Sequence, residues 1–434
     1  MIGASVNSSV VNLLNTIIGA GLLAIPYAIR TDGVVLGVLI VILSGIASGL
    51  GLVLQVLSSK FLPRGGSNFF TVCSITYPQL SVVFDIAIAI QCFGVGLSYI
   101  VLTGDLMPSI VEIDSFTHGQ ARVFWILLSL VIVLPLCYLR RLDSLKYASV
   151  VALVAIGYIV FIVYLYFFIG LPSGFQNVPN RGNISLWRPE GFKAIFSTFS
   201  IIVFAFTGHQ NMYSIINELE SPTLYRLHKI IIASISVAMA LFVSVGLMGY
   251  FPFGDAITGN IILMYENTRA VWFAKLLLVL MVLISFPLMF HPCRISINNI
   301  AYWVETKWKT ASDEAVPLLP GTATNPLGEK RFLILTTAIL IASYVIAISL
   351  KSFELILSLV GATGSTAISF ILPGLFGYKL INSTDPVLVK ALEDNYPEYD
   401  ARIFKSSKLR TLSLVLTVWG IISMFICLYA SLFI

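Results

Sequence analysis

Residues 12–27 read NLLNTIIGAGLLAIPY, an apolar run with small residues at its centre, polar residues before them and a proline after them. Glycine tolerates non-helical backbone, so Gly19 and Gly21 predict a break in what would otherwise be a membrane helix. An unwound stretch in mid-membrane exposes main-chain N–H groups and the positive end of a half-helix, which suit a carboxylate. Close packing of helices through small residues explains the same glycines equally well.

The composition of the whole chain requires a bilayer. Hydrophobic residues make up 58% of the 434 residues, and the mean hydropathy is +0.94. Charged residues make up 11%, against about 25% in soluble domains, which must cover their surface with polar groups. The net charge of +5 is modest and the basic residues lie between apolar runs, so no nucleic-acid partner is expected.

Eleven apolar stretches are long enough to span a bilayer, which takes about 20 residues of helix. Only helices satisfy every backbone polar group in hydrocarbon, and the sequence lacks the alternating pattern of a membrane barrel. We therefore predict an all-α polytopic membrane protein with a single transmembrane domain over residues 1–434. The predicted spans are roughly 7–29, 34–57, 80–108, 122–139, 147–170, 192–217, 229–251, 270–300, 332–350, 354–378 and 410–432.

A second interrupted stretch lies in the sixth span. Residues 204–211 read FAFTGHQN, in which a glycine is followed by three polar side chains. The two interrupted segments hold corresponding positions in two sets of five spans and run in opposite directions, as in transporters built from inverted repeats. We predict repeats over about 7–170 and 192–378, the span 410–432 outside them, and a substrate site at the paired breaks. A polar kink that only packs inside the bundle is the alternative for the second break.

The third span carries further candidate substrate contacts. Residues 91–99 read QCFGVGLSY, and helical spacing places Gln91, Val95 and Ser98 on one face. We predict substrate contacts at Gly94, Ser98 and Tyr99, although Tyr99 could equally belong to the core. Two carboxylates, at positions 85 and 105, lie toward opposite ends of this span, where charges usually meet water or headgroups.

The tenth span carries the candidate gate. Residues 361–366 read GATGST, in which glycine loosens the helix and hydroxyl groups could line a pathway. Our gate candidates are Thr363, Gly364 and Ser365. Packing of these small residues against the first span explains them nearly as well.

Histidines are the titratable groups nearest the middle of the predicted membrane. Because histidine changes charge near physiological pH, His209 and His291 are our candidates for proton coupling. His291 precedes a proline and could instead bond a freed carbonyl. A sodium site would need clustered hydroxyls on the eighth span, which offers Ser285 and Ser296, so we expect protons rather than sodium as the coupling ion.

The placement of basic residues predicts the topology. About two thirds of the lysines and arginines fall on the side of the N-terminus, which indicates a cytosolic N-terminus and a C-terminus across the membrane. No nucleotide-binding loop, metal-ligand cluster or CxxC pair is present, so an enzyme, a metal site and a cofactor are not expected. The polar stretch 301–331 predicts a flexible loop.

Four stretches, 12–27, 93–108, 197–219 and 359–379, resemble the amino acid/auxin permease family, particularly its fungal vacuolar branch that exports amino acids. This resemblance implies a LeuT-like fold of two inverted five-helix repeats plus an eleventh helix. It also implies proton-coupled amino acid movement by alternating access, at the vacuolar membrane. The substrate's amino and carboxyl groups would bind at Thr16, Ile18, Gly19, Ala20 and Gly21, together with Phe206, Thr207 and Gly208.

Several alternatives stay open from sequence. Glu314, Leu318 and Leu319 resemble an acidic dileucine sorting signal, which would bind a sorting adaptor. A plasma-membrane importer of amino acids and an amino acid receptor without transport are alternative functions. No acidic residue is predicted in mid-membrane, which favours neutral or acidic substrates over cationic ones.

Overall fold

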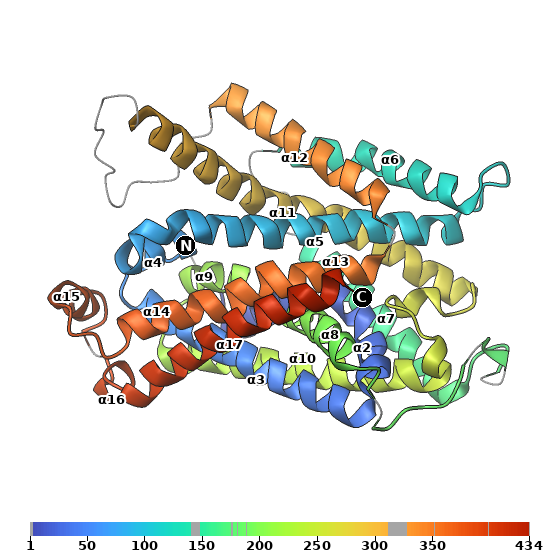
Figure 1. Ribbon diagram of the computed structural model, residues 1–434, viewed down its shortest axis with the longest axis horizontal. Helices are drawn as coiled ribbons and strands as arrows, with labels where there is room; N and C mark the ends of the chain where they lie inside the picture. The colour runs from blue at the N-terminus through green and yellow to red at the C-terminus, as the bar shows by residue number, and fades with distance from the viewer. Residues whose placement is uncertain are drawn as a thin grey trace.

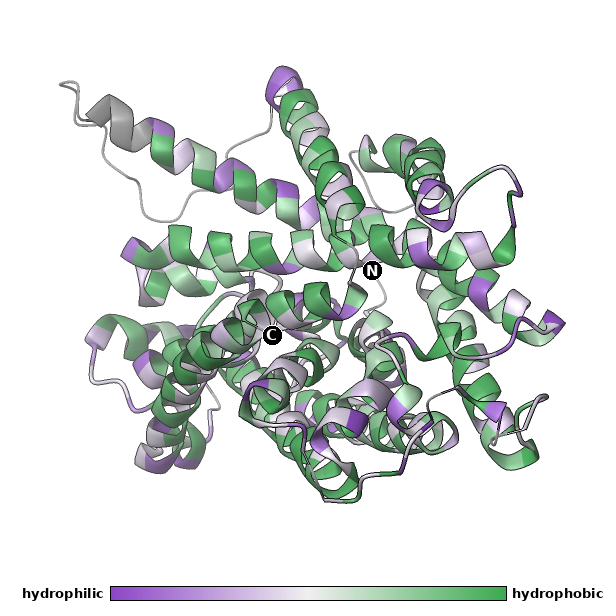
Figure 2. Cartoon of the chain, turned by 45° about the vertical axis from the view of Figure 1, so that its right-hand side comes forward, coloured by the Kyte–Doolittle hydropathy of each residue, from purple (hydrophilic) through white to green (hydrophobic). Residues whose placement is uncertain are grey.

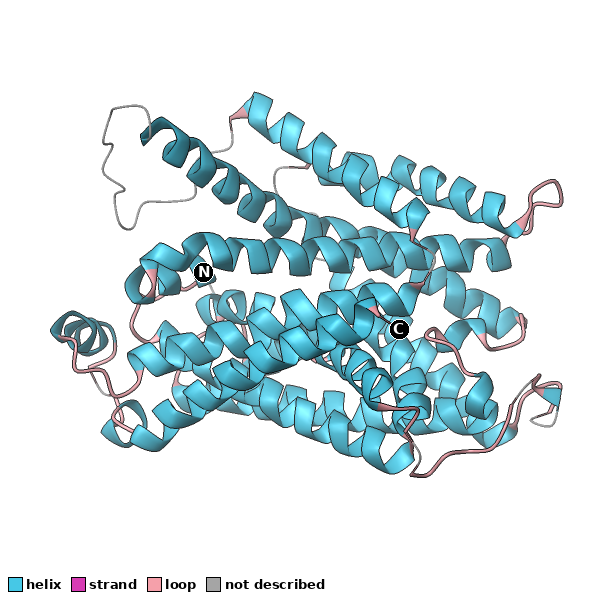
Figure 3. Cartoon of the chain, viewed as in Figure 1, coloured by secondary structure: helices cyan, strands magenta, loops and turns pink. Residues whose placement is uncertain are grey.

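The structure is a computed structural model that describes residues 3–139, 148–174, 177–179, 181–187, 189–310, 328–350, 352–397 and 399–433. Over these residues the chain is almost entirely helical (Figures 1 and 3). Its β-structure there consists of one isolated bridge between Ala4 and Leu219. The all-α prediction is therefore confirmed for the described part of the chain.

Ten helices or helix groups are long and apolar enough to cross a membrane, and a bent helix pair at the N-terminus makes an eleventh. The expected eleven spans are thus present. They are α1 (Val6–Ile17) with η1 (Ala20–Ala24) and α2 (Ile25–Asp32), α3 (Val34–Ser59), α5 (Ser81–Ile110), α6 (His118–Cys137), α7 (Ala148–Ile169), α8 (Phe192–Ala205) with α9 (His209–Glu218), α10 (Leu224–Phe253), α11 (Arg269–Thr310), α12 (Glu329–Ser349), α13 (Phe353–Val360) with η7 (Gly361–Ser365), η8 (Ala367–Ile371) and α14 (Leu372–Leu380), and α17 (Ser407–Leu432).

The outer surface of the bundle suits lipid. Large apolar side chains are exposed on its outer helices, among them Val131, Ile334 and Phe425, at 71%, 66% and 68%. Figure 2 shows hydrophobic residues along the helices and hydrophilic ones mainly at their ends and in the loops. Exposed apolar surface of this extent indicates an integral membrane protein.

The bundle has two ends, which we call the N-terminal face and the C-terminal face. Short helices α4 (Phe69–Thr76), α15 (Pro386–Asn395) and α16 (Ala401–Phe404) lie at the N-terminal face, at the left of Figure 1. The turns η5 (Gly254–Ala256) and η6 (Ile261–Leu263) lie between α10 and α11 at the C-terminal face. The prediction of a loop over 301–331 is wrong at its start, because α11 continues to Thr310.

Both predicted breaks are present, and they meet. α1 ends at Ile17 and the helix resumes at Ala20 after a bend of 48° across the pair, while α8 ends at Ala205 and α9 begins at His209. A Cβ atom on Gly21 would lie 2.8 Å from the Cα atom of Ala205. The two breaks therefore touch backbone to backbone, which only glycine permits at this position.

Candidate functional site

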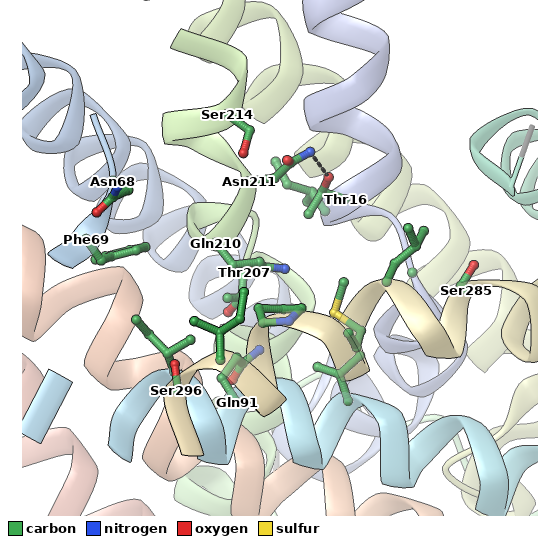
Figure 4. A pocket seen from close by; sticks show the side chains of 18 of the residues that line it. Thr16, Asn68, Phe69, Gln91, Thr207, Gln210, Asn211, Ser214, Ser285 and Ser296 are labelled. Atoms are coloured by element: carbon green, nitrogen blue, oxygen red, sulfur yellow. Dashed lines mark hydrogen bonds between the residues drawn. The ribbon is translucent and has the colours of Figure 1, made fainter. Parts of the chain in front are cut away.

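A cavity of about 770 Å³ lies beside the two breaks, between α1, α4, α5, α9 and α11 (Figure 4). It extends from the break in the first span toward the N-terminal face, because residues of α4 and of the first turns of α5 line it. Part of its wall is polar, which distinguishes it from a packing defect. The polar lining residues are Asn12, Asn15, Thr16, Asn68, Thr71, Ser74, Ser81, Asp85, Gln91, Thr207, Gln210, Asn211, Ser214, Ser285, Ser296 and Asn299.

Polar side chains join the two interrupted spans at the cavity. The Nδ2 atom of Asn211 donates to Asn12 Oδ1 and to Thr16 Oγ1, each over 3.0 Å (Figure 4 draws the bond to Thr16). The Thr16 hydroxyl in turn donates to the carbonyl oxygen of Asn12 at 2.9 Å. Because these bonds link α1 to α9, the half-helices that flank the breaks on the N-terminal face are held together.

Main chain lies open at the break of the first span. A Cβ atom on Gly19 would meet no atom within 4 Å, so a ligand could approach this backbone closely. Seven of the predicted substrate-binding residues line the cavity. They are Thr16, Ile18, Gly19, Ala20, Gly21, Tyr99 and Thr207.

Two predicted contacts on α5 do not line the cavity. A Cβ atom on Gly94 would lie 2.1 Å from the Val360 side chain, so this glycine serves a close contact with α13. Ser98 is fully buried and its hydroxyl donates to the carbonyl oxygen of Val95 at 2.7 Å. The helix presents Gln91, Val95 and Tyr99 to the cavity instead.

Two predicted contacts at the second break also point elsewhere. The ring of Phe206, predicted to contact the substrate, packs against Phe242 of α10 with 4.8 Å between ring centroids. Gly208 faces α1, because a Cβ atom there would lie 2.7 Å from the Ile17 side chain. Of the second break's predicted residues, Thr207 alone lines the cavity.

The two histidine candidates lie outside the cavity wall. His209 is fully buried, and its Nε2 atom lies 3.1 Å from the carbonyl oxygen of Ser48 on α3. Gln55 of α3 donates to the His209 carbonyl at 3.2 Å, so this residue holds the break against α3. His291 lies between two prolines of α11 and is half-buried.

The predicted gate coincides with an irregular stretch of helix. Residues 361–365 and 367–371 form π-helix, a wider winding that often marks functional sites. Ser365 donates to Gln91 Oε1 at 2.8 Å, and Gly364 packs against the backbone of Gln91. Thr363 bonds within its own helix, to the carbonyl oxygen of Leu359. None of the three lines the cavity, but Ser365 holds a residue that does.

The sequence did not reveal the part of the cavity nearest the N-terminal face. Asp85 was expected at water or headgroups, yet it is 8% exposed and lines the cavity, where Asn299 donates to it at 3.2 Å. Among the residues that line the cavity it alone carries a charge. The eight residues of α4 were missed because they are too few for a span.

Contacts at the C-terminal face close the other end of the bundle. The Glu354 carboxylate accepts a bond of 2.6 Å from the backbone N–H of Gly259, which joins α13 to the segment between α10 and α11. Ion pairs of 2.8 Å join Arg30 to Glu190 and Arg122 to Asp105. These contacts hold the elements of this face together, whereas the lining of the cavity reaches toward the other face.

The family model for transmembrane amino acid transporter proteins matches residues 3–395 of the chain. The chain belongs to this family of transporters. It is 38% identical to vacuolar amino acid transporter 7 of Saccharomyces cerevisiae, over 99% of this chain and 98% of the yeast protein. It is 39% identical to vacuolar amino acid transporter 5 of Schizosaccharomyces pombe, over 86% and 83% of the two chains. Its membership excludes an enzyme and confirms the predicted resemblance.

The fold of this transporter is that of a solved one. It superposes on MhsT in complex with L-phenylalanine with a TM-score of 0.59 and 10% sequence identity, over 98% of each chain. The LeuT-like architecture is therefore confirmed. Over the described residues the transporter has no group of three metal-ligating side chains. The sorting-signal residues Glu314, Leu318 and Leu319 lie outside the described residues.

Proposed function

We propose that this transporter carries amino acids from the vacuole lumen to the cytosol by alternating access, coupled to protons. The single observation that carries the proposal is the cavity beside two touching helix breaks, which extends toward one face while contacts such as Glu354–Gly259 join the elements of the other. Open main chain at the break suits the amino and carboxyl groups that all amino acids share. The vacuolar location draws on the names of the two yeast relatives.

The distribution of basic residues supports a cytosolic N-terminal face. On that assignment the structure would be the cytosol-open conformation of the cycle, with the lumenal side closed by Glu354 and the Arg30–Glu190 pair. Release of substrate to the cytosol would then proceed past α4 and Asp85.

Asp85 bears on the substrate class. The sequence favoured neutral or acidic amino acids, but a carboxylate in the wall of the cavity repels an acidic side chain. We therefore propose neutral amino acids as substrates, with cationic ones tolerated and acidic ones disfavoured. Competition by unlabelled amino acids of each charge would test this order, and strongest competition by glutamate or aspartate would refute it.

Protons and sodium are the two candidate coupling ions. Protons are our proposal, with His209 and His291 as the candidates from sequence. Sodium is the alternative, because a human relative, 25% identical, is named sodium-coupled neutral amino acid transporter 7. Ser285 and Ser296 of α11 do line the cavity, as a sodium site on that helix would require.

The decisive experiment is uptake of radiolabelled amino acids into proteoliposomes under an imposed proton or sodium gradient. Gly208→Leu should abolish uptake, because its side chain would enter α1, whereas Gly157→Leu on the exposed side of α7 should retain it. Uptake that follows the sodium gradient alone would overturn proton coupling. Saturable binding without uptake would favour the receptor alternative, and location at the plasma membrane would favour the importer.

A further inference from the structure

A buried carboxyl group lies at the C-terminal face, away from the cavity. Asp32 ends α2 and is fully buried against α8 and the start of α3. Its Oδ1 atom lies 2.7 Å from Thr198 Oγ1, and its Oδ2 atom has no partner among the described residues. A carboxylate with one hydrogen bond in a dry site is very costly, whereas a neutral carboxylic acid is not.

No cation neutralises Asp32 within the described residues. Arg30, two residues before Asp32 in the same helix, pairs with Glu190 at 2.8 Å, and Glu190 adds negative charge nearby. The segment of α3 has no titratable residue. Three further titratable groups near the C-terminal face have partners other than Asp32. Lys193 of α8 lies over the Tyr429 ring, and Tyr250 of α10 accepts from the Ser185 N–H. Arg181 donates to the Phe251 carbonyl.

The Thr198 hydroxyl allows a proton on Asp32. This hydroxyl lies 3.0 Å from the carbonyl oxygens of Ala194 and Ile195 as well as beside Asp32. A hydroxyl has one hydrogen and can also accept. If Thr198 donates to a carbonyl of its own helix, a protonated Asp32 can donate to Thr198, and no buried charge remains. The Oδ2 atom stays without a partner, but as an uncharged oxygen it costs far less than a carboxylate.

We propose that Asp32 is a proton-binding site, neutral while the C-terminal face is closed, which releases its proton when that face opens to water. In the closed face, backbone bonds join Ser185 to Val34, at the start of α3, and Glu190 to Thr31 of α2. Opening this face would hydrate Asp32 and favour the ionised form. Proton binding at Asp32 therefore favours the conformation that is closed here and open at the N-terminal face. This proposal rests on alternating access, which the proposed function includes.

Infrared difference spectroscopy of the purified, substrate-free transporter tests the protonation itself. We expect a carbonyl-stretching band of a protonated carboxyl group at neutral pH, lost in Asp32→Asn and retained in Asp255→Asn, an exposed carboxylate of the same face. Thr198→Ala should shift the band rather than remove it, because it deletes only the hydrogen-bond partner. Identical bands in wild type and Asp32→Asn would overturn the proposal. Because this readout needs no transport, it is independent of the proposed function.

The conformational consequence has its own readout. A cysteine substituted at Ser81, which lines the cavity, is labelled by maleimide when the N-terminal face is open. In a background free of the five native cysteines, the labelling rate divided by that of the same cysteine in Asp32→Asn should fall as the pH rises, by up to about tenfold per pH unit for a single linked proton. This ratio cancels the faster reaction of maleimide with the thiolate at higher pH. Asp32→Asn should stay labelled at every pH, since its side chain cannot ionise. An unchanged pH response in Asp32→Asn would refute the link between proton and closure.

Discussion

At the scale of single residues, Gly21 decides how closely the two breaks approach. A Cβ atom there would lie 2.8 Å from both the Cα and the Cβ atom of Ala205, and the backbone cannot yield cheaply. We expect Gly21→Ala to lower the free energy of unfolding by about 1–3 kcal/mol, the usual cost of overpacking. Thermal unfolding in detergent measures this. Gly19→Ala is the matched control, because nothing lies within 4 Å of its added methyl group. Equal losses in both variants would contradict the steric explanation.

A second residue-scale prediction concerns Lys60, just past the end of α3. Burial, with a smaller contribution from the nearby Arg64, lowers the pKa of its ammonium group to about 8. In the unfolded chain the pKa returns to about 10.4, so between these values the unfolded state holds the extra proton. Burial of Lys60 thus costs stability below about pH 8, and stability rises as the pH increases through this window.

We expect the free energy of unfolding to gain on the order of 3 kcal/mol between about pH 8 and pH 10 from this group. Lys60→Met should remove most of the gain, although it also loses the bond to the Pro222 carbonyl and the contact with Tyr396. Thermal unfolding of both proteins across this pH range makes the comparison. A gain of the same size in Lys60→Met would assign the pH dependence to other groups.

At the scale of elements, one hydrogen bond connects the π-helical stretch to the cavity wall. Ser365 of η7 donates to Gln91 of α5 over 2.8 Å, and both side chains are buried. Ser365→Ala leaves the Gln91 oxygen without this donor, which costs about 1–3 kcal/mol. A double-mutant cycle with Gln91→Leu should give a coupling energy of about 0.5–1.5 kcal/mol in unfolding experiments. Additive losses would show that the bond contributes nothing specific.

At the scale of elements, the sequence predicts where helices break but not which way their side chains point. The breaks could be predicted because two glycine-interrupted segments at corresponding positions of two sets of five spans are typical of transporters built from inverted repeats. The direction in which the side chains of Ser98 and Phe206 point could not be predicted. It depends on the rotation of each helix, which neighbours far along the chain, such as α13 and α10, determine. Asp32 was not among the candidates from sequence, and only the fold shows that it is buried while Arg30 pairs with Glu190.

At the scale of the whole molecule, the two ends of the bundle differ in what closes them. Long-range contacts seal the C-terminal face through Glu354 and Gly259, while polar residues from α4, α5 and α11 line the cavity toward the N-terminal face. Two ends that open alternately need contacts that form in one state only. A variant that removes a seal should therefore shift the population of states rather than unfold the chain.

Gly259 provides that variant. A Cβ atom there would lie 1.7 Å from Glu354 Cγ, so Gly259→Ala must displace the carboxylate and break the 2.6 Å bond. A loss of about 1.4 kcal/mol from the closed state changes the ratio of closed to open molecules about tenfold. We therefore expect maleimide labelling of a cysteine at Ser81 to slow by up to about that factor. Glu354→Gln should slow it less, because its amide oxygen can still accept from the Gly259 N–H as a neutral partner. Faster labelling in Gly259→Ala would mean that this contact holds the transporter away from the cytosol-open state, and the assignment of the seal would then be reversed.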